Sequence, residues 1–244
     1  MFQILHKEFR SVLDQFLQSK PIKHLAAGQL SVAQYRSYLK QVYFYVRENP
    51  QLQALATIYF RGRQREMVRS FYSHASSEIG HEQLALNDYI TLGGNADNVV
   101  YKNPLPATTA LTAFAFYQIY NKNPLGYLGY LFFLEFLPTR SGESIANQLM
   151  SAGIPENATT FLRDHMEIDV GHNRLMEKYA DALLKTDADV DAAIYAMRTT
   201  GYLYAQMIEA AFADEHEQID TGWNWDELQA DNKLPEEEAV AVAR

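Results

Sequence analysis

The sequence contains no cysteine, little glycine and proline, and no long uninterrupted hydrophobic run. Without cysteine, the 244-residue chain has no disulfide bonds, no zinc site built on thiolates and no cysteine nucleophile. It has 12 glycines and 8 prolines, fewer than the roughly 7% and 5% of an average protein. This scarcity disfavours a β-sandwich with many turns and favours long helices.

Positive charge is also scarce, since 21 lysines and arginines face 30 acidic residues and give a formal net charge of −9. A protein that binds nucleic acid through phosphate contacts has the opposite balance, so no nucleic-acid partner is expected. The longest apolar stretch, residues 125–137, contains Glu135 and is shorter than the ~20 residues of a membrane span, which predicts a buried helix and no membrane partner. The first ten residues carry charges where a signal peptide has its apolar core, so we expect a cytoplasmic protein.

Apolar residues recur with helical periodicity along almost the whole chain, which predicts an all-α protein of about eight helices in a single domain over residues 1–220. Ser31 followed by Gln34 is the pattern of a helix-capping box. Residues 221–244 are acidic and lack an apolar stripe, so they are expected to form a loosely docked or disordered tail. The expected helices cover residues 2–19, 31–49, 51–60, 66–92, 107–121, 125–137, 141–152, 157–184 and 189–216.

The segment HMEIDVGH places His165, Asp169 and His172 at positions i, i+4 and i+7. On a helix these three side chains project from one narrow stripe. Two imidazoles and a carboxylate on one stripe offer nitrogen and oxygen ligands that suit Fe(II), Mn(II) or Zn(II). The alternative is a polar helix face on which the histidines are incidental.

The same spacing occurs a second time, in His74, Glu78 and His81. Glu78 and His81 also form a Glu-x-x-His element, which di-iron sites in helical bundles use to point both groups into the core. A solvated acidic face is the alternative. Two such triads are much harder to obtain by chance than one, so the pair favours a metal site.

Glu135 supplies a third helix with a candidate ligand, because its neighbours in LGYLFFLEFLP are almost all apolar. A carboxylate buried in such a helix costs several kcal/mol unless it is paired or bound to a metal. An ion pair with Arg140 is the alternative. The candidate ligands carry three carboxylates and three imidazoles, a set that fits two metals better than one: Glu78, His81, Glu135, His165, Asp169 and His172.

At these residues the chain resembles the heme-oxygenase-like diiron oxidases and oxygenases. LAAGQLSVAQYRSYLKQVYFYV is similar to that family's second helix, SSEIGHEQLALNDYITLGG to its first ligand helix, LGYLFFLEFLP to its middle ligand helix, and FLRDHMEIDVGH to its pattern H-x-x-x-D-x-x-H. The resemblance implies a heme-oxygenase-like helical bundle with two Fe(II) ions per chain, the second weakly held, and Mn(II) as a substitute. It assigns the metal positions to the six residues named above.

The chain departs from this family at one position. Several members place a carboxylate seven or more residues before the first-helix histidine, whereas this chain has His74 seven residues before His81. Either Glu78 ligates alone from this helix, or His74 joins or replaces it. We expect His74 to lie beside the metals or to line the pocket, two helical turns away from His81.

The resemblance implies an enzyme that activates O₂ on a small amino-acid, amine or carboxylate substrate, by N-oxygenation, hydroxylation, desaturation or C–C cleavage. A non-catalytic protein that binds metal or a small molecule is the alternative; heme binding through His6 or His24 is less favoured, and the missing cysteine argues against a thiaminase. A second copy of the chain is a candidate partner. The candidate pocket walls, each also compatible with ordinary core packing, are Tyr43, Tyr45, Tyr127, Tyr130 and Phe133.

Overall fold

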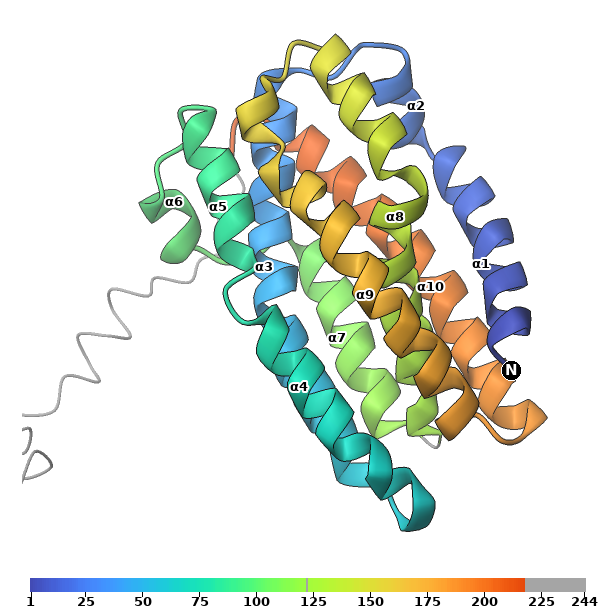
Figure 1. The fold of residues 1–244 in the computed structure, drawn as a ribbon. Coiled ribbons are helices and arrows are strands. Elements are labelled where there is room, and N and C mark those ends of the chain that lie inside the picture. The colour runs from blue at the N-terminus through green and yellow to red at the C-terminus, as the bar shows by residue number, and fades with distance from the viewer. Residues whose placement is uncertain (122, 218–244) are drawn as a thin grey trace, which may run out of the picture.

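The computed structural model describes residues 1–121 and 123–217, and the secondary-structure elements of this part of the chain are all helices, without strands. The all-α prediction is therefore confirmed, while the expected tail over residues 221–244 lies outside the described residues. Four short 3-10 helices, η1 (Thr57–Tyr59), η2 (Gly62–Met67), η3 (Pro124–Gly126) and η4 (Glu156–Ala158), connect longer elements. The α-helices are α1 (Phe2–Leu17), α2 (Lys20–Ala26), α3 (Val32–Ala56), α4 (Val68–Glu78), α5 (Glu82–Thr91), α6 (Asp97–Val100), α7 (Pro106–Tyr120), α8 (Tyr127–Ser151), α9 (Thr160–Leu183) and α10 (Asp187–Ala213) (Figure 1).

Two of the long helices, α3 and α10, begin with capping boxes. At the start of α3 the Ser31 hydroxyl accepts the backbone N–H of Gln34, and the Gln34 side chain accepts the N–H of Ser31. Thr186 and Asp189 make the same reciprocal pair at the start of α10. These boxes satisfy N–H groups that a helix start otherwise leaves without partners.

Three prolines lie at or near helix ends that the sequence predicts. The helices expected over residues 31–49 and 125–137 each end just before a proline, but α3 and α8 continue through Pro50 and Pro138 to Ala56 and Ser151. A proline removes one backbone hydrogen bond, and here packing on both sides of it holds the helix together, since α8 lies along α9 and α10 and α3 lies along α4, α5 and α7. Pro21 does not simply end the first helix; it occupies the first turn of α2, where a missing N–H costs nothing.

The single helix expected over residues 66–92 is wrong, because the chain breaks it between α4 and α5. Glu78 is the last residue of α4, Ile79 is extended, and Gly80 has a φ of +95°. That left-handed conformation suits glycine and cannot continue an α-helix. The break changes the directions of the Glu78 and His81 side chains relative to those of one straight helix.

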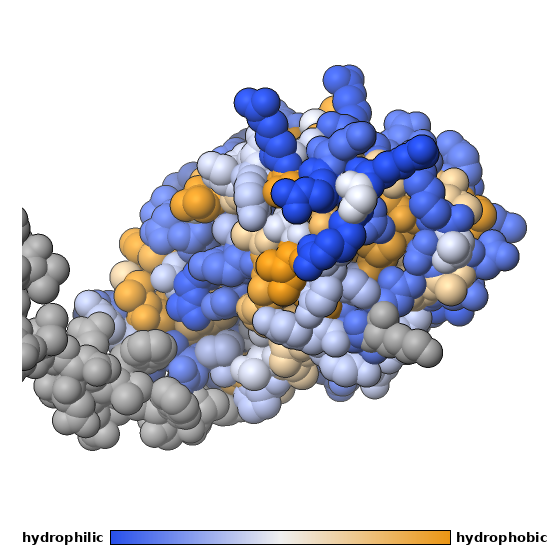
Figure 2. Space-filling model, turned by 90° about the horizontal axis from the view of Figure 1, so that it is seen from below, coloured by the Kyte–Doolittle hydropathy of each residue, from blue (hydrophilic) through white to orange (hydrophobic). Residues whose placement is uncertain are grey.

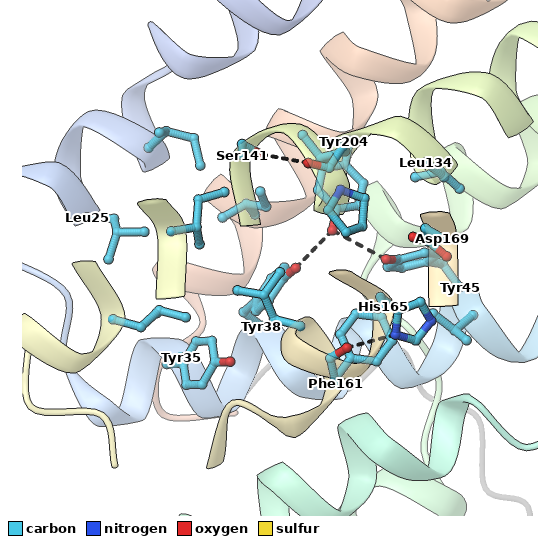
Figure 3. A pocket seen from close by; sticks show the side chains of 18 of the residues that line it. Leu25, Tyr35, Tyr38, Tyr45, Leu134, Ser141, Phe161, His165, Asp169 and Tyr204 are labelled. Carbon is cyan, nitrogen blue, oxygen red and sulfur yellow. Dashed lines mark hydrogen bonds between the residues drawn. The ribbon is translucent and has the colours of Figure 1, made fainter. Parts of the chain in front are cut away.

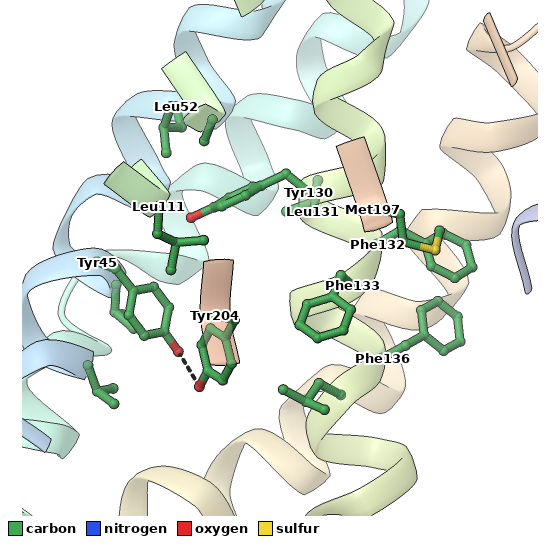
Figure 4. Close-up of a cluster of buried hydrophobic side chains, with 14 of the residues drawn as sticks. Tyr45, Leu52, Leu111, Tyr130, Leu131, Phe132, Phe133, Phe136, Met197 and Tyr204 are labelled. Carbon is green, nitrogen blue, oxygen red and sulfur yellow. Dashed lines mark hydrogen bonds between the residues drawn. The ribbon is translucent and has the colours of Figure 1, made fainter. Parts of the chain in front are cut away.

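The core is a packed set of aliphatic and aromatic side chains, to which α8 contributes more rings than any other described helix (Figure 4). Phe132 and Phe136 stack with ring centroids 4.3 Å apart, and Phe133 faces Tyr204 of α10. The backbones of α8 and α10 approach closely at Gly129, where a Cβ atom would lie 1.9 Å from the carbonyl oxygen of Ala193. This close packing fixes α8, and with it Glu135, against the bundle.

The end of the bundle that is seen from below is mostly hydrophilic, with hydrophobic residues in small separate groups (Figure 2). Within residues 1–121 and 123–217, no helix combines the length and the apolarity needed to cross a lipid bilayer.

Candidate metal centre

The ends and faces of three helices bring the predicted ligands together inside the bundle. The end of α4 supplies His74 and Glu78, and the turn before α5 supplies His81. Glu135 projects from the middle of α8, and α9 presents its predicted stripe toward the same point. All of these side chains are buried except His81, which is half-buried.

A first group of donors consists of His74, Glu78, Glu135 and His172, whose ligand atoms all lie within 4.8 Å of one another. The Nε2 atom of His74 is 3.1 Å from Glu135 Oε1, and the Nδ1 atom of His172 is 3.0 Å from Glu135 Oε2. The two imidazole rings lie 4.1 Å apart between their centroids. This compact arrangement of two imidazoles and two carboxylates can hold one metal ion.

A second group adjoins the first and consists of Glu78, His81 and His165. His81 Nδ1 lies 3.2 Å from Glu78 Oε2, and the His81 and His165 rings are 5.0 Å apart. His165 Nδ1 donates a hydrogen bond to the Phe161 carbonyl oxygen at 2.7 Å. This bond fixes the imidazole tautomer and leaves Nε2 with the lone pair that a metal needs.

Glu78 belongs to both groups, and its two oxygens divide between them. Oε1 lies 3.3 Å from His172 Nδ1 and 3.8 Å from His74 Nε2, whereas Oε2 faces His81. A carboxylate in this position can bind one metal with each oxygen, as in two-metal sites with ions ~3.5–4 Å apart.

Asp169 lies at the edge of the cluster rather than within either group of donors. Its Oδ1 atom is 3.3 Å from His172 Nδ1, and the side chain lines the adjoining cavity. His74, by contrast, was expected to lie beside the metals or to line the pocket, with ligation as the alternative, and its Nε2 atom lies inside the first group. The expectation rested on the distance between His74 and His81 along one helix. In the structure His74 lies one turn before Glu78 and belongs to the first group of donors, whereas His81 belongs to the second.

The hydrogen bonding of the donor set fits a bound divalent metal. His172 Nδ1 has three carboxylate oxygens within 3.3 Å, although one ring nitrogen can donate only a single hydrogen. The buried Glu78 Oε1 atom also makes no hydrogen bond. Such crowding and such an unpartnered oxygen are costly in a buried site, and metal ligation relieves both.

Burial and mutual charge shift the pKa values in the cluster. Burial opposes ionisation of Glu135, but the hydrogen bond from His172 and the neighbouring His74 outweigh it and lower the carboxyl pKa. Burial also opposes a charge on His172, yet its hydrogen bonds to Asp169 and Glu135 raise its pKa to about 10. Burial, followed by repulsion from Glu135, raises the pKa of Asp169 to about 8. Without metal, the proton that His172 holds offsets part of the carboxylate charge.

The alternative partners considered for these residues lie elsewhere. Arg140, the candidate counter-ion of Glu135, contacts His6 at 3.4 Å and the ring of Phe136 instead. His24 bonds to the side chain of Gln34. The carboxylate of Glu135 therefore has imidazoles as its neighbours, as a metal site requires.

A cavity of about 100 Å³ opens from the cluster, with Glu78, Glu135, His165 and Asp169 in its wall (Figure 3). Of the expected wall residues, only Tyr45 lines it. The other four are packed into the surrounding core: Tyr43, Tyr127, Tyr130 and Phe133.

The sequence analysis missed the remaining tyrosines of the cavity, Tyr35, Tyr38 and Tyr204. Tyr38 and Tyr45 are seven residues apart on α3, so helical spacing could have placed them on one face. Nothing in the sequence pattern could have paired them with Tyr204, because α10 meets α3 only in the folded chain.

Comparisons with known proteins agree with this architecture. Solved structures with a similar fold include a domain of unknown function with a heme oxygenase-like fold from Shewanella denitrificans OS217 (TM-score 0.81, 24% identity, 88% of this chain and 94% of that chain). Others are a TenA homologue from P. horikoshii OT3 (TM-score 0.67, 12% identity, 86% and 97%) and a CADD-like protein of unknown function from Nostoc punctiforme PCC 73102 (TM-score 0.67, 18% identity, 86% and 98%). No curated protein gives a significant match.

The family comparison covers most of the chain and includes every candidate metal ligand. Residues 36–205 match the family model described as iron-containing redox enzyme. This match spans the end of α4, the middle of α8 and all of α9, which carry the buried histidines and carboxylates described above. The chain belongs to the iron-containing redox enzymes with a heme-oxygenase-like fold.

Proposed function

We propose that this chain is a nonheme diiron oxidase or oxygenase that uses O₂ to oxidise a small organic molecule. The observation that carries the proposal is the position of Glu78 between two groups of donors, with one oxygen facing each. A site for a single metal would need only one of these groups.

In this proposal His74, Glu135 and His172 would hold one iron and His81 and His165 the other, and Glu78, which belongs to both groups, would contribute to each. Mixed imidazole and carboxylate ligands suit Fe(II), and they accept Mn(II) as well. When bound, a ferrous pair supplies the electrons that reduce O₂.

The protein's own residues control charge and access around the irons. Glu78 and Glu135, the two carboxylates among the proposed ligands, carry two negative charges against the four positive charges of two Fe(II) ions, so the loaded site attracts an anionic group. The Phe161 carbonyl holds the His165 ring in place. The adjoining cavity gives a small molecule access to Glu78, Glu135 and Asp169, and most of its wall is apolar.

Anaerobic titration with Fe(II), followed by O₂, tests the proposal. The protein should bind two equivalents of iron and then show a transient visible absorption band and O₂ consumption when O₂ is added. Glu135→Ala should lose iron and O₂ reactivity while its helical circular dichroism stays unchanged. Glu143→Ala, an exposed glutamate on the same helix, is the matched control and should behave as the parent protein.

Two outcomes would contradict the proposal. Stable binding of iron without any reaction with O₂ would instead indicate a protein that uses the metal structurally. Parental O₂ consumption by the Glu135→Ala variant would remove Glu135 from the proposed ligands.

A further inference from the structure

The cavity beside the metal cluster has three zones of different chemistry (Figure 3). His165 and Asp169 mark the end formed by the candidate ligands, and Leu25 of α2 marks the opposite end. Tyrosine side chains from α3 and α10 lie between these two ends. A molecule that fills the cavity must therefore match an ionic end, a hydroxyl-lined middle and an apolar end.

The middle zone contains a chain of three tyrosine hydroxyls. The hydroxyl oxygens of Tyr38 and Tyr204 are 2.8 Å apart, and those of Tyr45 and Tyr204 are 3.3 Å apart. Tyr45 is the member that lies toward Asp169 (Figure 3). Burial raises the pKa of each hydroxyl, so all three keep their protons at neutral pH.

The three tyrosine hydroxyls have one hydrogen-bond donor more than the bonds between them use. Three tyrosines carry three hydroxyl hydrogens, and the two hydrogen bonds between them use only two. One O–H therefore remains available to an acceptor inside the cavity. A buried donor is stabilised when a ligand oxygen accepts it.

Two other neutral side chains of the wall already have an oxygen engaged within the protein. Asn49 Oδ1 accepts the hydroxyl of Tyr130, and the hydroxyl of Ser141 donates to the Leu137 carbonyl oxygen. Tyr38, Tyr45 and Tyr204 lie between the two ends of the cavity and share a spare O–H, so they are the neutral donors best placed to recognise a head group beside the cluster.

The third zone is aliphatic and lacks any counter-charge. Its wall comes from α2, the turn that follows α2, α8 and α10, and includes Ile22, Leu25, Leu30, Ile145, Leu149 and Ile208. No lysine or arginine is found among the described residues that line the cavity. A ligand group that enters this zone must be uncharged, because a charge there would be desolvated without a partner.

We propose that the cavity binds a molecule with one oxygen-bearing head group and an aliphatic tail, with the head beside the metal cluster and hydrogen-bonded by the tyrosine chain and the tail between α2, α8 and α10. This inference rests on the proposed function and names the class of molecule that the site accepts. It selects against polar amino acids, whose side-chain charge would lie in the apolar zone.

Isothermal titration calorimetry on the Mn(II)-loaded protein tests the class of ligand without any turnover. The probes are straight-chain carboxylates from hexanoate to dodecanoate, kept below their critical micelle concentrations, with decanol, decylamine, L-lysine and L-arginine. Affinity should rise roughly threefold to fourfold for each added CH₂ until the aliphatic zone is full. Decanoate and decanol should bind, and the two amino acids should not.

One pair of variants tests the head-group contact. Tyr204→Phe removes the hydroxyl at the centre of the chain and should weaken decanoate binding roughly 10-fold, the effect of one hydrogen bond to a charged group. Tyr202→Phe lies two residues away on the exposed face of α10 and should leave the affinity unchanged. Tyr38→Phe removes a single contact and provides a second, milder variant should Tyr204→Phe fold poorly.

A second pair tests the position of the tail. Ile145→Phe narrows the aliphatic zone and should make the affinity level off at a shorter chain length. Ile194→Phe changes an isoleucine of similar partial burial outside the cavity and should keep the parental chain-length profile.

The inference is overturned if affinity does not depend on chain length, if L-lysine, L-arginine or decylamine binds more tightly than decanoate, or if Tyr204→Phe and Tyr202→Phe bind decanoate equally well. These results are independent of the proposed reaction. Binding of decanoate by a protein that never consumes O₂ would leave the inference intact and refute the function. O₂ consumption triggered by a polar amino acid alone would support the proposed function and refute the inference.

Discussion

Glu78→Gln tests whether one carboxylate serves both metal positions, because in that case a single substitution should weaken both of them. Glutamine keeps the shape of the side chain but loses the negative charge and one acceptor oxygen. Because Glu78 Oε1 faces His172 and Oε2 faces His81, the substitution should weaken both metal positions. His81→Ala should affect only the second position, and His74→Ala only the first.

The magnitude follows from what each ligand contributes. Loss of a group that merely supports a metal ligand costs about 10- to 100-fold in metal affinity. Loss of the shared ligand should therefore exceed about 100-fold at both positions. A metal present at 100 times its Kd stabilises the fold by about 2.7 kcal/mol, which for a chain of this size corresponds to a rise in Tm of roughly 5–11 °C per ion.

The assay combines anaerobic iron analysis after desalting with melting curves in the presence and absence of Fe(II). The parent should retain two iron ions, His81→Ala and His74→Ala one each, and Glu78→Gln fewer than one. Glu82→Gln, a half-buried carboxylate at the start of α5 that belongs to neither donor group, serves as the control. Retention of one full equivalent by Glu78→Gln would refute the shared position.

Three further outcomes are expected. Mn(II) binding should release protons and strengthen between about pH 6 and about pH 9. Burial opposes the charge on His172, but neighbouring carboxylates raise its pKa to about 10, so the metal must displace its proton. Calorimetry in buffers of different ionisation enthalpy detects this proton release, and an affinity that does not change with pH would contradict it. Gly80→Ala should lower the free energy of unfolding by about 1–2 kcal/mol, because alanine disfavours the positive φ of this residue. Gly171→Ala, at an open position within a helix, should raise the free energy of unfolding by about 0.5–1 kcal/mol. Equal shifts of the two variants in urea melts would contradict the left-handed conformation of Gly80. Gly129→Ala should cost about 1–3 kcal/mol by pushing α8 away from the Ala193 carbonyl, and an unchanged urea midpoint would contradict that close approach.

The candidate ligands that could be found in the sequence are those whose geometry depends on one helix. His165, Asp169 and His172 lie on α9, which runs unbroken from Thr160 to Leu183, so their spacing translates directly into a shared face. Glu135 could be found because a carboxylate among apolar neighbours needs a partner. In both cases a local rule was sufficient.

The positions of His74 and His81 could not be derived in this way, because the chain changes direction between them. The spacing of seven residues assumes a continuous helix, but Gly80 adopts a left-handed conformation and separates α4 from α5. Glycine within a helical pattern is a weak signal for a break, and only tertiary packing decides whether the helix continues. The same limit explains why Pro50 was expected to end α3.

The cavity depended still more on the folded chain. Its tyrosine hydroxyls come from α3 and α10, which are far apart in the sequence. Its aliphatic end is completed by α2. A single sequence shows many aromatic residues but not which of them face a common space, so Tyr43 and Tyr127 were selected although they pack in the core.

The most direct test of the central claim is a crystal structure of the Mn(II)-loaded protein with anomalous diffraction measured at the manganese edge. The account predicts two anomalous peaks ~3.5–4 Å apart, with one Glu78 oxygen bound to each ion, His74, Glu135 and His172 around the first, and His81 and His165 around the second. A single peak, or two peaks without Glu78 between them, would contradict it.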